Sequence, residues 1–378
     1  MHFLVPYVRH FRALGWRIEG AASGVDSDPR ATEFDAVHEV PISRSIKDVR
    51  GMMEGARVIG SVLEHGYDIV HVHTPIASFI TRAMVRRMPD DRRPPLVYTA
   101  HGFHFYEGGH PLTNAAFLTA ERVAGRWTDR LVVINREDHE AAQRYHIVPR
   151  RRLRYMPGIG VDTDWYSRAD VTDEASRAAL DEMGLEAGRP YFVTVGELSR
   201  RKRPWDVVRA LAQMGESEPA LLFVGGGSER TAVLELAAEL GVADRVVISP
   251  AWVSDVRPLI APAMALVQAS RQEGLPRSIM EALALEVPVV TSDARGCAEL
   301  VGDDRGYVVP VAASTQMAAA MDHLARDPEE RTAMGERGRR LMVERFDLQP
   351  LIEEHEKLYA ELLPDAGSPS LKRRADDA

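Results

Sequence analysis

The chain has 378 residues, of which 45% are hydrophobic and 27% are charged, and its formal net charge is −9. This length allows two domains with sizeable cores, and the acidic balance argues against general nucleic-acid binding. The single cysteine, Cys297, excludes an internal disulfide and fits a reducing compartment. We find no signal-peptide pattern and no apolar run of the length that a membrane span needs, so we expect a cytoplasmic protein.

The first part of the chain alternates helices and strands. An amphipathic helix over 3–14 comes first, and a strand over 16–22 follows. The pattern then predicts helices at 48–65, 77–88 and 113–127, and strands at 68–73, 96–99, 131–135 and 151–156. Short apolar strands between helices indicate a parallel sheet that is covered on both faces.

The order of the first elements is unusual for such a domain. A Rossmann-like domain begins with a strand, whereas this chain begins with the helix over 3–14. We therefore expect that the first strand is missing, through truncation or a start site placed too late. That strand would be central to the sheet, so its absence would weaken the domain.

A second alternating series starts at residue 191, after a polar segment (168–188) that we interpret as the domain boundary. Its predicted strands are 191–196, 220–224, 246–249, 264–268, 288–291 and 307–311, and its predicted helices are 204–213, 228–240, 255–261, 277–285 and 296–302. The fold class is therefore α/β with two doubly wound domains, at 1–165 and 166–346. A last helix over 347–363 carries an apolar stripe, and 364–378 has the composition of a disordered tail.

The most informative stretch runs from Ser270 to Thr291. It reads as a loop that carries Glu273, then a helix that carries Glu281 near its start, then a buried strand. Free N–H groups at the helix start, around Gly274 to Pro276, suit a diphosphate, while the two carboxylates suit the hydroxyl groups of a sugar or a ribose. Solvated surface charges remain the alternative. The loop follows a strand end, however, where ligands bind in open α/β sheets.

Two further loops follow strand ends in the second domain. Gly196 is followed by Glu197, Leu198, Ser199 and then four basic residues, Arg200 to Arg203. Most basic runs are solvated, but this one lies at the same sheet edge as Glu273, so we favour phosphate binding by Lys202 and a neighbouring arginine. The run Gly225–Gly227, with Gly226 at its centre, would let a ligand approach the backbone, although a tight turn without a ligand explains it nearly as well.

Histidines and arginines mark the first domain. His71 and His73 alternate on one strand, and His101 and His104 follow the next strand. A metal site would need matching acidic or cysteine ligands, which we do not find, so we expect no metal. His101 is the best candidate for a group that acts in catalysis or positions the acceptor. His73 is a weaker candidate, and His104 could be structural. Basic clusters at 82–93 and 150–152 could touch an anionic membrane, although a solvated face explains each cluster alone.

These motifs together carry a family resemblance. Glu273 and Glu281 with seven residues between them, opened by Glu-Gly-Leu-Pro and closed by Glu-Ala-Leu-Ala, resemble the retaining glycosyltransferases of family 4. The segments 71–76, 99–105, 134–138 and 196–198 resemble the branch that builds bacterial capsule, exopolysaccharide and lipid-linked glycans. The resemblance implies the GT-B fold, in which two Rossmann-like domains face each other across a cleft.

The resemblance also implies roles for individual residues. Glu273 would hold hydroxyls of the transferred sugar, Lys202 and the amides of Gly274, Leu275 and Pro276 would hold the diphosphate, and Glu281 would hold the ribose. The base would lie against the loop that contains Trp252 and Val256. On the acceptor side the implied residues are His101, His73 and His104. Transfer would retain the anomeric configuration and need no metal or other cofactor.

The chain departs from the family pattern at Glu197, where many members have arginine. The second positive contact to phosphate would then come from Arg201 or Arg203. The implied partners are a nucleotide-sugar donor, with a UDP-linked N-acetylhexosamine as the first guess, and a lipid-linked or glycan acceptor. Peripheral contact with the inner face of the plasma membrane is a further expectation. A nucleotide-sugar 2-epimerase and a non-catalytic nucleotide-sugar binding protein remain as alternatives.

Overall fold

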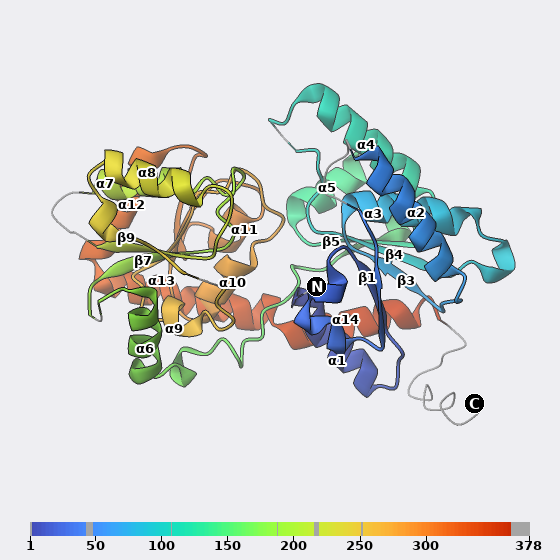
Figure 1. The fold of residues 1–378 in the computed structure, drawn as a ribbon, viewed down its shortest axis with the longest axis horizontal. Coiled ribbons are helices and arrows are strands. Elements are labelled where there is room, and N and C mark those ends of the chain that lie inside the picture. Colours follow the sequence, from blue (N-terminus) through green and yellow to red (C-terminus); the bar gives the residue numbers. More distant parts are fainter. Residues whose placement is uncertain are drawn as a thin grey trace. The chain divides into compact units, whose positions relative to one another are not determined.

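The computed structural model describes residues 2–42, 48–106, 108–186, 188–214, 219–250 and 252–363 (Figure 1). The chain divides into two compact units. Unit 1 comprises Met1–Ile159 and Gln349–Ala378, and unit 2 comprises Gly160–Leu348. Each unit is α/β with parallel strands. The tail predicted at 364–378 lies outside the described residues.

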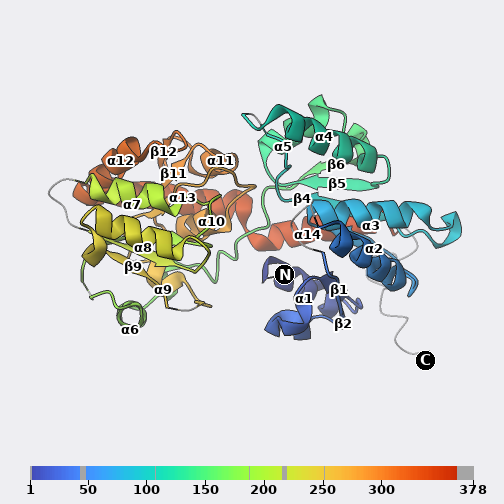
Figure 2. The same cartoon turned by 45° about the horizontal axis from the view of Figure 1, so that its top comes forward.

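Unit 1 contains two parallel sheets. Its larger sheet has four strands in the order β3-β4-β5-β6. These strands are Val70–Val72, Leu96–Ala100, Arg130–Val133 and Leu153–Tyr155. The helices that connect or precede them are α2 (Val49–Leu63), α3 (Pro75–Arg87), α4 (Pro111–Gly125) and α5 (Arg136–Arg144). The smaller sheet pairs β1 (Glu19–Ala22) with β2 (Ala36–Glu39), next to α1 (Val5–Ala13) (Figure 2).

Both faces of the four-stranded sheet are buried, because successive side chains of a strand point to opposite faces. Tyr98 and Leu131 belong to a core that also includes residues of α2 and α3. On the other face, Val97 and Val132 pack with Leu351 of the last helix, α14 (Leu348–Ala360). The apolar stripe of α14 therefore completes the core of unit 1.

Unit 2 is built on a six-stranded parallel sheet in the order β12-β11-β10-β7-β8-β9. The strands are β7 (Tyr191–Val195), β8 (Ala220–Val224), β9 (Val246–Ile248), β10 (Leu266–Gln268), β11 (Val289–Ser292) and β12 (Gly306–Val309). The helices are α6 (Asp173–Met183), α7 (Pro204–Ala212), α8 (Arg230–Glu239), α9 (Arg257–Ile260), α10 (Arg277–Ala284), α11 (Cys297–Val301), α12 (Ser314–Arg326) and α13 (Pro328–Leu341). Figure 1 shows α7 and α8 on one side of β7 and α9 and α10 on the other.

The strand order of unit 2 positions the candidate site. The chain adds β8 and β9 on one side of β7 and then crosses back to add β10 on the other side. Connections therefore leave the adjacent ends of β7 and β10 in opposite directions. In open α/β sheets such a switch point leaves a crevice at the carboxyl ends of the strands, where ligands bind.

The division between the two units lies earlier than the predicted position after residue 165. Residues 160–165 belong to unit 2, because the Val161 amide donates to the Phe346 carbonyl (2.9 Å) and the Thr163 hydroxyl donates to Asp347 (2.6 Å). The polar segment 168–188, which we interpreted as the domain boundary, lies inside unit 2 and holds helix α6, which is capped by Thr172 and buries Leu180.

Two elements of unit 1, β2 and α5, were not predicted from the sequence. The two sheets of unit 1 share no strand within the part of the chain that the structure describes. None of the helices described is long and apolar enough to cross a membrane.

Candidate functional site

Two loops at the switch point of unit 2 are joined by two hydrogen bonds, one between backbones and one from an arginine side chain. The first follows β7 and carries Arg201, and the second follows β10 and carries Arg271 and Gln272. The Arg271 amide donates to the Arg201 carbonyl (2.8 Å), and the Arg201 guanidinium donates to the Gln272 carbonyl (2.7 Å). The relative position of these loops is therefore set by hydrogen bonds rather than by side-chain packing alone.

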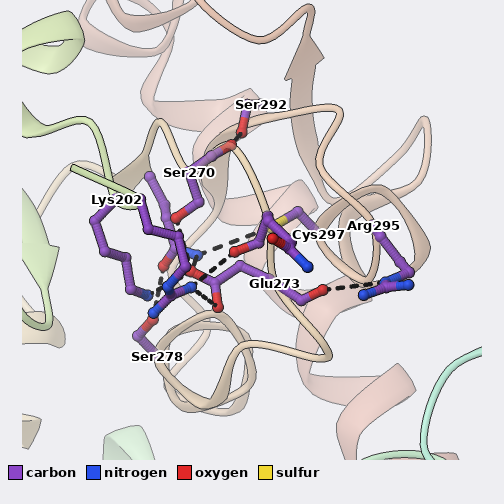
Figure 3. Close-up of polar contacts among 10 residues, drawn as sticks. Lys202, Ser270, Glu273, Ser278, Ser292, Arg295 and Cys297 are labelled. Atoms are coloured by element: carbon purple, nitrogen blue, oxygen red, sulfur yellow. Dashed lines mark hydrogen bonds and ion pairs between the residues drawn. The ribbon is translucent and has the colours of Figure 1, made fainter. Parts of the chain in front are cut away.

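Glu273 is the centre of the polar contacts in this region (Figure 3). Its carboxylate lies 2.8 Å from Lys202 Nζ and 2.8 Å from Arg201 Nη1, and it accepts a hydrogen bond of 2.8 Å from the Ser270 hydroxyl. The side chain is only 10% exposed. Burial raises the pKa of Glu273, but the two cations and the hydrogen bonds outweigh burial and hold that pKa below its usual range. The buried carboxylate is therefore ionised.

Hydrogen bonds among neighbouring polar residues support the loop that carries Glu273. The Ser278 hydroxyl at the start of α10 donates to Gln268 Oε1 (2.8 Å), and Gln268 Nε2 lies 3.8 Å from Cys297 Sγ. The Ser292 hydroxyl donates to the Ser270 carbonyl. Burial raises the pKa of the Cys297 thiol to about 12, so this thiol is neutral. These supporting residues were not predicted from the sequence. The signal that could have indicated them is the presence of polar residues at the ends of otherwise apolar strands.

The loop before α11 contacts the backbone of Glu273 and Gly274. Arg295 Nε donates to the Glu273 carbonyl (3.3 Å). Gly296 has φ +76°, and a Cβ atom at that position would lie 1.9 Å from the Gly274 carbonyl oxygen. Only glycine allows both this conformation and this close approach.

Glycines of the β7 and β8 loops also make close contacts. A Cβ atom on Gly225 would lie 2.3 Å from the Gly196 carbonyl oxygen, and the Leu198 amide donates to the Gly226 carbonyl (2.8 Å). Gly196 itself lies beside Lys202, since a Cβ atom there would be 3.6 Å from Lys202 Nζ. A Cβ atom on Gly226 would meet no such neighbour within 4 Å. The Gly225–Gly227 run therefore locks the β7 loop in position.

The structure brings most of the predicted diphosphate residues together. Lys202 and Arg201 lie beside Glu273, and Gly196 lies beside Lys202. Gly274, Leu275 and Pro276 follow Glu273 in the chain and lead into α10. Pro276 is the N-cap residue and has no N–H group, so the amides offered there come from its neighbours.

Arg203 lies apart from this group. It has φ +51°, its guanidinium pairs with Asp206 (2.6 Å), and it lies over the Trp205 ring (5.5 Å). Of the two arginines that were candidates for the second phosphate contact, only Arg201 is beside Glu273.

Glu281 belongs to a second, buried group. It lies 2.7 Å from Arg277 and accepts a hydrogen bond of 2.8 Å from the Tyr166 hydroxyl. Burial is the largest influence on Glu281 and raises its pKa, and the charge of Asp255 adds to this effect. The loop predicted to meet the base is thus close to Glu281.

Two residues of that loop had been predicted as base contacts. Val256 occupies the N-cap position of α9, and Trp252 is 78% exposed.

Three histidines of unit 1 form a half-buried cluster. His73 Nδ1 and His101 Nε2 are 3.2 Å apart, and the two rings stack with centroids 5.4 Å apart. His71 hydrogen-bonds through Nδ1 to Tyr359 (2.6 Å) and through Nε2 to Thr99 (2.8 Å). Burial lowers the pKa of His101 to about 4 and lowers those of His71 and His73 as well. The cluster is therefore neutral at pH 7.

His104 does not join this cluster. Its side chain is exposed, and its ring lies 5.0 Å from that of Phe117 on α4. His101 and His73 are thus brought together by the fold, whereas His104 lies at the surface.

Two other groups of described residues have a spacing that could hold a metal ion. They are Glu19 with His38 and His65, and His323 with Asp327 and Glu330. Neither group includes a residue of the Glu273 site. Positive charge at that site comes from Lys202 and Arg201.

The geometry of unit 2 agrees with comparisons to known proteins. Residues 5–165 match the family described as Glycosyltransferase Family 4, and residues 177–341 match the family described as Glycosyl transferases group 1. Over 362 residues the chain is 29% identical to a protein named as the glycosyltransferase EpsD of Bacillus subtilis (strain 168), covering 95% of this chain and 92% of that protein.

A second relative is the UDP-Gal:alpha-D-GlcNAc-diphosphoundecaprenol alpha-1,3-galactosyltransferase of Escherichia coli. It is 22% identical over 326 residues, which cover 84% of this chain and 81% of the relative. Among solved structures, HepE of Anabaena in complex with UDP has a TM-score of 0.76 and 18% identity, with 95% of this chain and 96% of that chain covered.

These matches decide among the three alternatives left by the sequence. Both family descriptions and the names of both relatives specify transferases, which favours transfer over epimerisation or binding alone. With the Rossmann-like folds of both units, they identify the chain as a glycosyltransferase of the hexosyltransferase type, a member of glycosyltransferase family 4 with the GT-B fold.

Proposed function

We propose that this glycosyltransferase moves a sugar from a nucleotide-diphosphate sugar, UDP-linked, to a hydroxyl group of a lipid-linked or polysaccharide acceptor, with retention at the anomeric carbon. The observation that carries the proposal is the ionised Glu273 between Lys202 and Arg201 at the switch point of unit 2. The Glu273 carboxylate can accept hydrogen bonds from the sugar half of such a donor. The two cations beside it, Lys202 and Arg201, match the diphosphate half.

The sugar half of the donor would be held by Glu273. Its two carboxylate oxygens accept hydrogen bonds from hydroxyl groups, and charge-assisted bonds of this kind are stronger than neutral ones. The contact from Ser270 and the tight packing of Gly274 under Gly296 keep the carboxylate in one orientation. Such preorganisation reduces the cost of aligning the sugar for reaction.

The diphosphate half would be stabilised by Lys202 and Arg201. Negative charge grows on the leaving diphosphate as its bond to the anomeric carbon breaks. Fixed cations near that oxygen stabilise the transition state more than the ground state. The amides of Gly274 and Leu275 precede α10, whose N-terminal end favours anions.

The proposed reaction proceeds on one face of the sugar. The bond between the anomeric carbon and the diphosphate oxygen breaks, and the acceptor oxygen bonds to the same carbon from the same side. The acceptor proton passes to the leaving phosphate. The proposal uses no protein nucleophile and no metal, because the phosphate acts as the base and Lys202 and Arg201 supply the positive charge.

The nucleoside would lie near Glu281. This carboxylate is close to the loop that carries Asp255 and Val256, so a ribose hydroxyl and a base could be bound together. A ligand there would share Glu281 with Tyr166 and Arg277. The UDP complex of the similarly folded HepE supports UDP as the first nucleotide to test.

His101 would position the acceptor hydroxyl. The low pKa keeps its imidazole neutral at pH 7, so it can accept or donate a hydrogen bond without carrying charge. A lipid-linked acceptor is supported by the name of the Escherichia coli relative, which specifies a diphosphoundecaprenol. Transfer to a lipid-linked acceptor would require a cytoplasmic protein that contacts the inner face of the plasma membrane peripherally. Its role would then be in cell-surface glycan biosynthesis.

Radiolabelled UDP-N-acetylhexosamines, UDP-glucose and UDP-galactose tested with undecaprenyl-diphosphate-linked sugars would test the proposal. We expect labelled lipid product, an α-linkage from an α-linked donor, and undiminished transfer in the presence of a metal chelator. Glu273→Ala should abolish the product. A product of inverted configuration, or a rate that is unchanged by Glu273→Ala, would contradict the mechanism.

A further inference from the structure

The basic run after β7 is divided between two places. Arg201 and Lys202 pair with Glu273, as described above. Arg200 and Arg203 instead line a shallow pocket of about 440 Å³ on unit 2. Arg203 has a left-handed backbone and is the N-cap residue of α7. A single basic stretch in the sequence thus serves two different surfaces.

The pocket gathers positive charge from three elements. Its lining consists of Arg200, Arg203, Trp205, Arg209, Glu229 and Arg271. Arg271 comes from the loop after β10, so this concentration of arginines is made by the fold and not by the basic run alone. In a chain with a net charge of −9, four guanidinium groups around one pocket are a marked local reversal of charge.

The acidic residues nearby neutralise only part of this charge. Asp206 pairs with Arg203 (2.6 Å) and Arg209 (3.4 Å), and its side chain is 4% exposed. These pairs orient the two guanidinium groups. Glu229 lies 3.7 Å from Arg200, which is 89% exposed, so this contact is weak.

Arg271 differs from Arg203 and Arg209, which both pair with Asp206. Its side chain is exposed and makes no ion pair with any acidic residue that the structure describes. The pocket therefore presents two guanidinium groups that are available to an anion, Arg200 and Arg271, beside two that are already held in place.

We propose that this pocket binds a phosphate group at a site distinct from the Glu273 site. Guanidinium groups bind phosphate oxygens in pairs, and arginines from separate loops can approach one phosphate from two sides. Trp205 is half-buried in the pocket wall and offers a flat surface to whatever carries the phosphate. The phosphate can belong to a soluble phosphate ester or to a lipid headgroup, and both present the same chemistry to the arginines.

Binding to the purified full chain without any sugar donor tests this site, and the test does not depend on the proposed function. The probes are pyrophosphate, measured by calorimetry, and vesicles of phosphatidylglycerol with phosphatidylcholine, measured by co-sedimentation against phosphatidylcholine alone. The test variant is the pair Arg200→Gln and Arg271→Gln. The matched control is Arg177→Gln with Arg340→Gln, two exposed arginines of α6 and α13 outside the pocket.

We expect the pocket pair to weaken binding of at least one probe by roughly tenfold or more, as the loss of charge-assisted hydrogen bonds predicts. The control pair and Lys202→Met should retain that binding event. Loss with pyrophosphate indicates a soluble phosphate ester, and loss with anionic vesicles alone indicates a headgroup. The proposal is overturned if the wild-type chain binds neither probe, if the pocket pair binds like the control, or if Lys202→Met removes the same event.

Discussion

Lys202 Nζ lies 2.8 Å from Glu273 Oε1, and the two residues are 71 positions apart in the sequence. The lysine side chain is 17% exposed and the glutamate side chain 10% exposed. Burying a carboxylate is costly, and Glu273 stays ionised because Lys202, Arg201 and the Ser270 hydroxyl contact it. The pair of Lys202 and Glu273 joins the β7 loop to the β10 loop and provides opposite charges at one point of the sheet edge.

Glu273→Gln should reduce transfer by roughly 100-fold or more, in the range seen when a preorganised polar contact to the reacting group is lost. The amide keeps the shape of the side chain but carries no charge to strengthen hydrogen bonds from sugar hydroxyls. Initial rates with saturating acceptor measure the effect. The matched control is Glu239→Gln on the exposed face of α8, which should behave as wild type. Activity within a few-fold of wild type in Glu273→Gln would remove this residue from the site.

Lys202→Met should lower kcat more than it raises KM, by roughly 100-fold, because the cation acts on charge that develops as the diphosphate leaves. The methionine retains most of the aliphatic stem of lysine. Steady-state kinetics with varied donor separates the two parameters, and Lys357→Met on α14 serves as the control for loss of a lysine. A rise in KM alone would indicate that Lys202 only binds the donor.

Gly296→Ala should impair transfer, whereas Gly241→Ala should not. Both glycines have positive φ, +76° and +70°, so an alanine is strained at either position by about 1–2 kcal/mol. Only at Gly296 would the new methyl group collide with the Gly274 carbonyl and move the loop behind Glu273. Chemical denaturation and transfer rates of both variants check this. Equal loss of activity in the two variants would show that strain alone is responsible.

Acidification should destabilise the protein through the half-buried histidines of unit 1. The pKa of His101 is about 4 in the folded chain, below the usual value of 6.5, so the unfolded chain binds more protons between these values. Stability is therefore lost as the pH falls from 6.5 towards 4, and His101 alone contributes about 2 kcal/mol of that loss by pH 5. His71, His73 and His355 shift in the same direction.

Urea denaturation at pH 7 and pH 5 measures this dependence. His101→Asn should have a smaller difference between the two pH values than wild type. His110→Asn, at the exposed N-cap of α4, is the control and should leave the difference unchanged. If His101→Asn has the full wild-type difference, His101 is not buried in its neutral form.

Much of the architecture could be predicted from the sequence, since the buried strands of both units are short apolar runs between helical patterns. Strand β2 was missed because Ala36–Glu39 contains one strongly β-favouring residue, Val37, and only its pairing with β1 makes it a strand. Helix α6 was missed because its surface is largely polar, so its segment was interpreted as the domain boundary.

The sequence by itself determined the alternating α/β pattern, the position of Glu273 before a helix start and the presence of a basic run after β7. It could do so because periodicity and turn residues are local properties of the chain. Only the tertiary structure decided which basic side chains meet Glu273. The φ of +51° at Arg203 turns that arginine towards Asp206, while Lys202 and Arg201 reach a carboxylate on another loop. Such pairings depend on strand order and backbone conformation, which no single stretch of the chain contains.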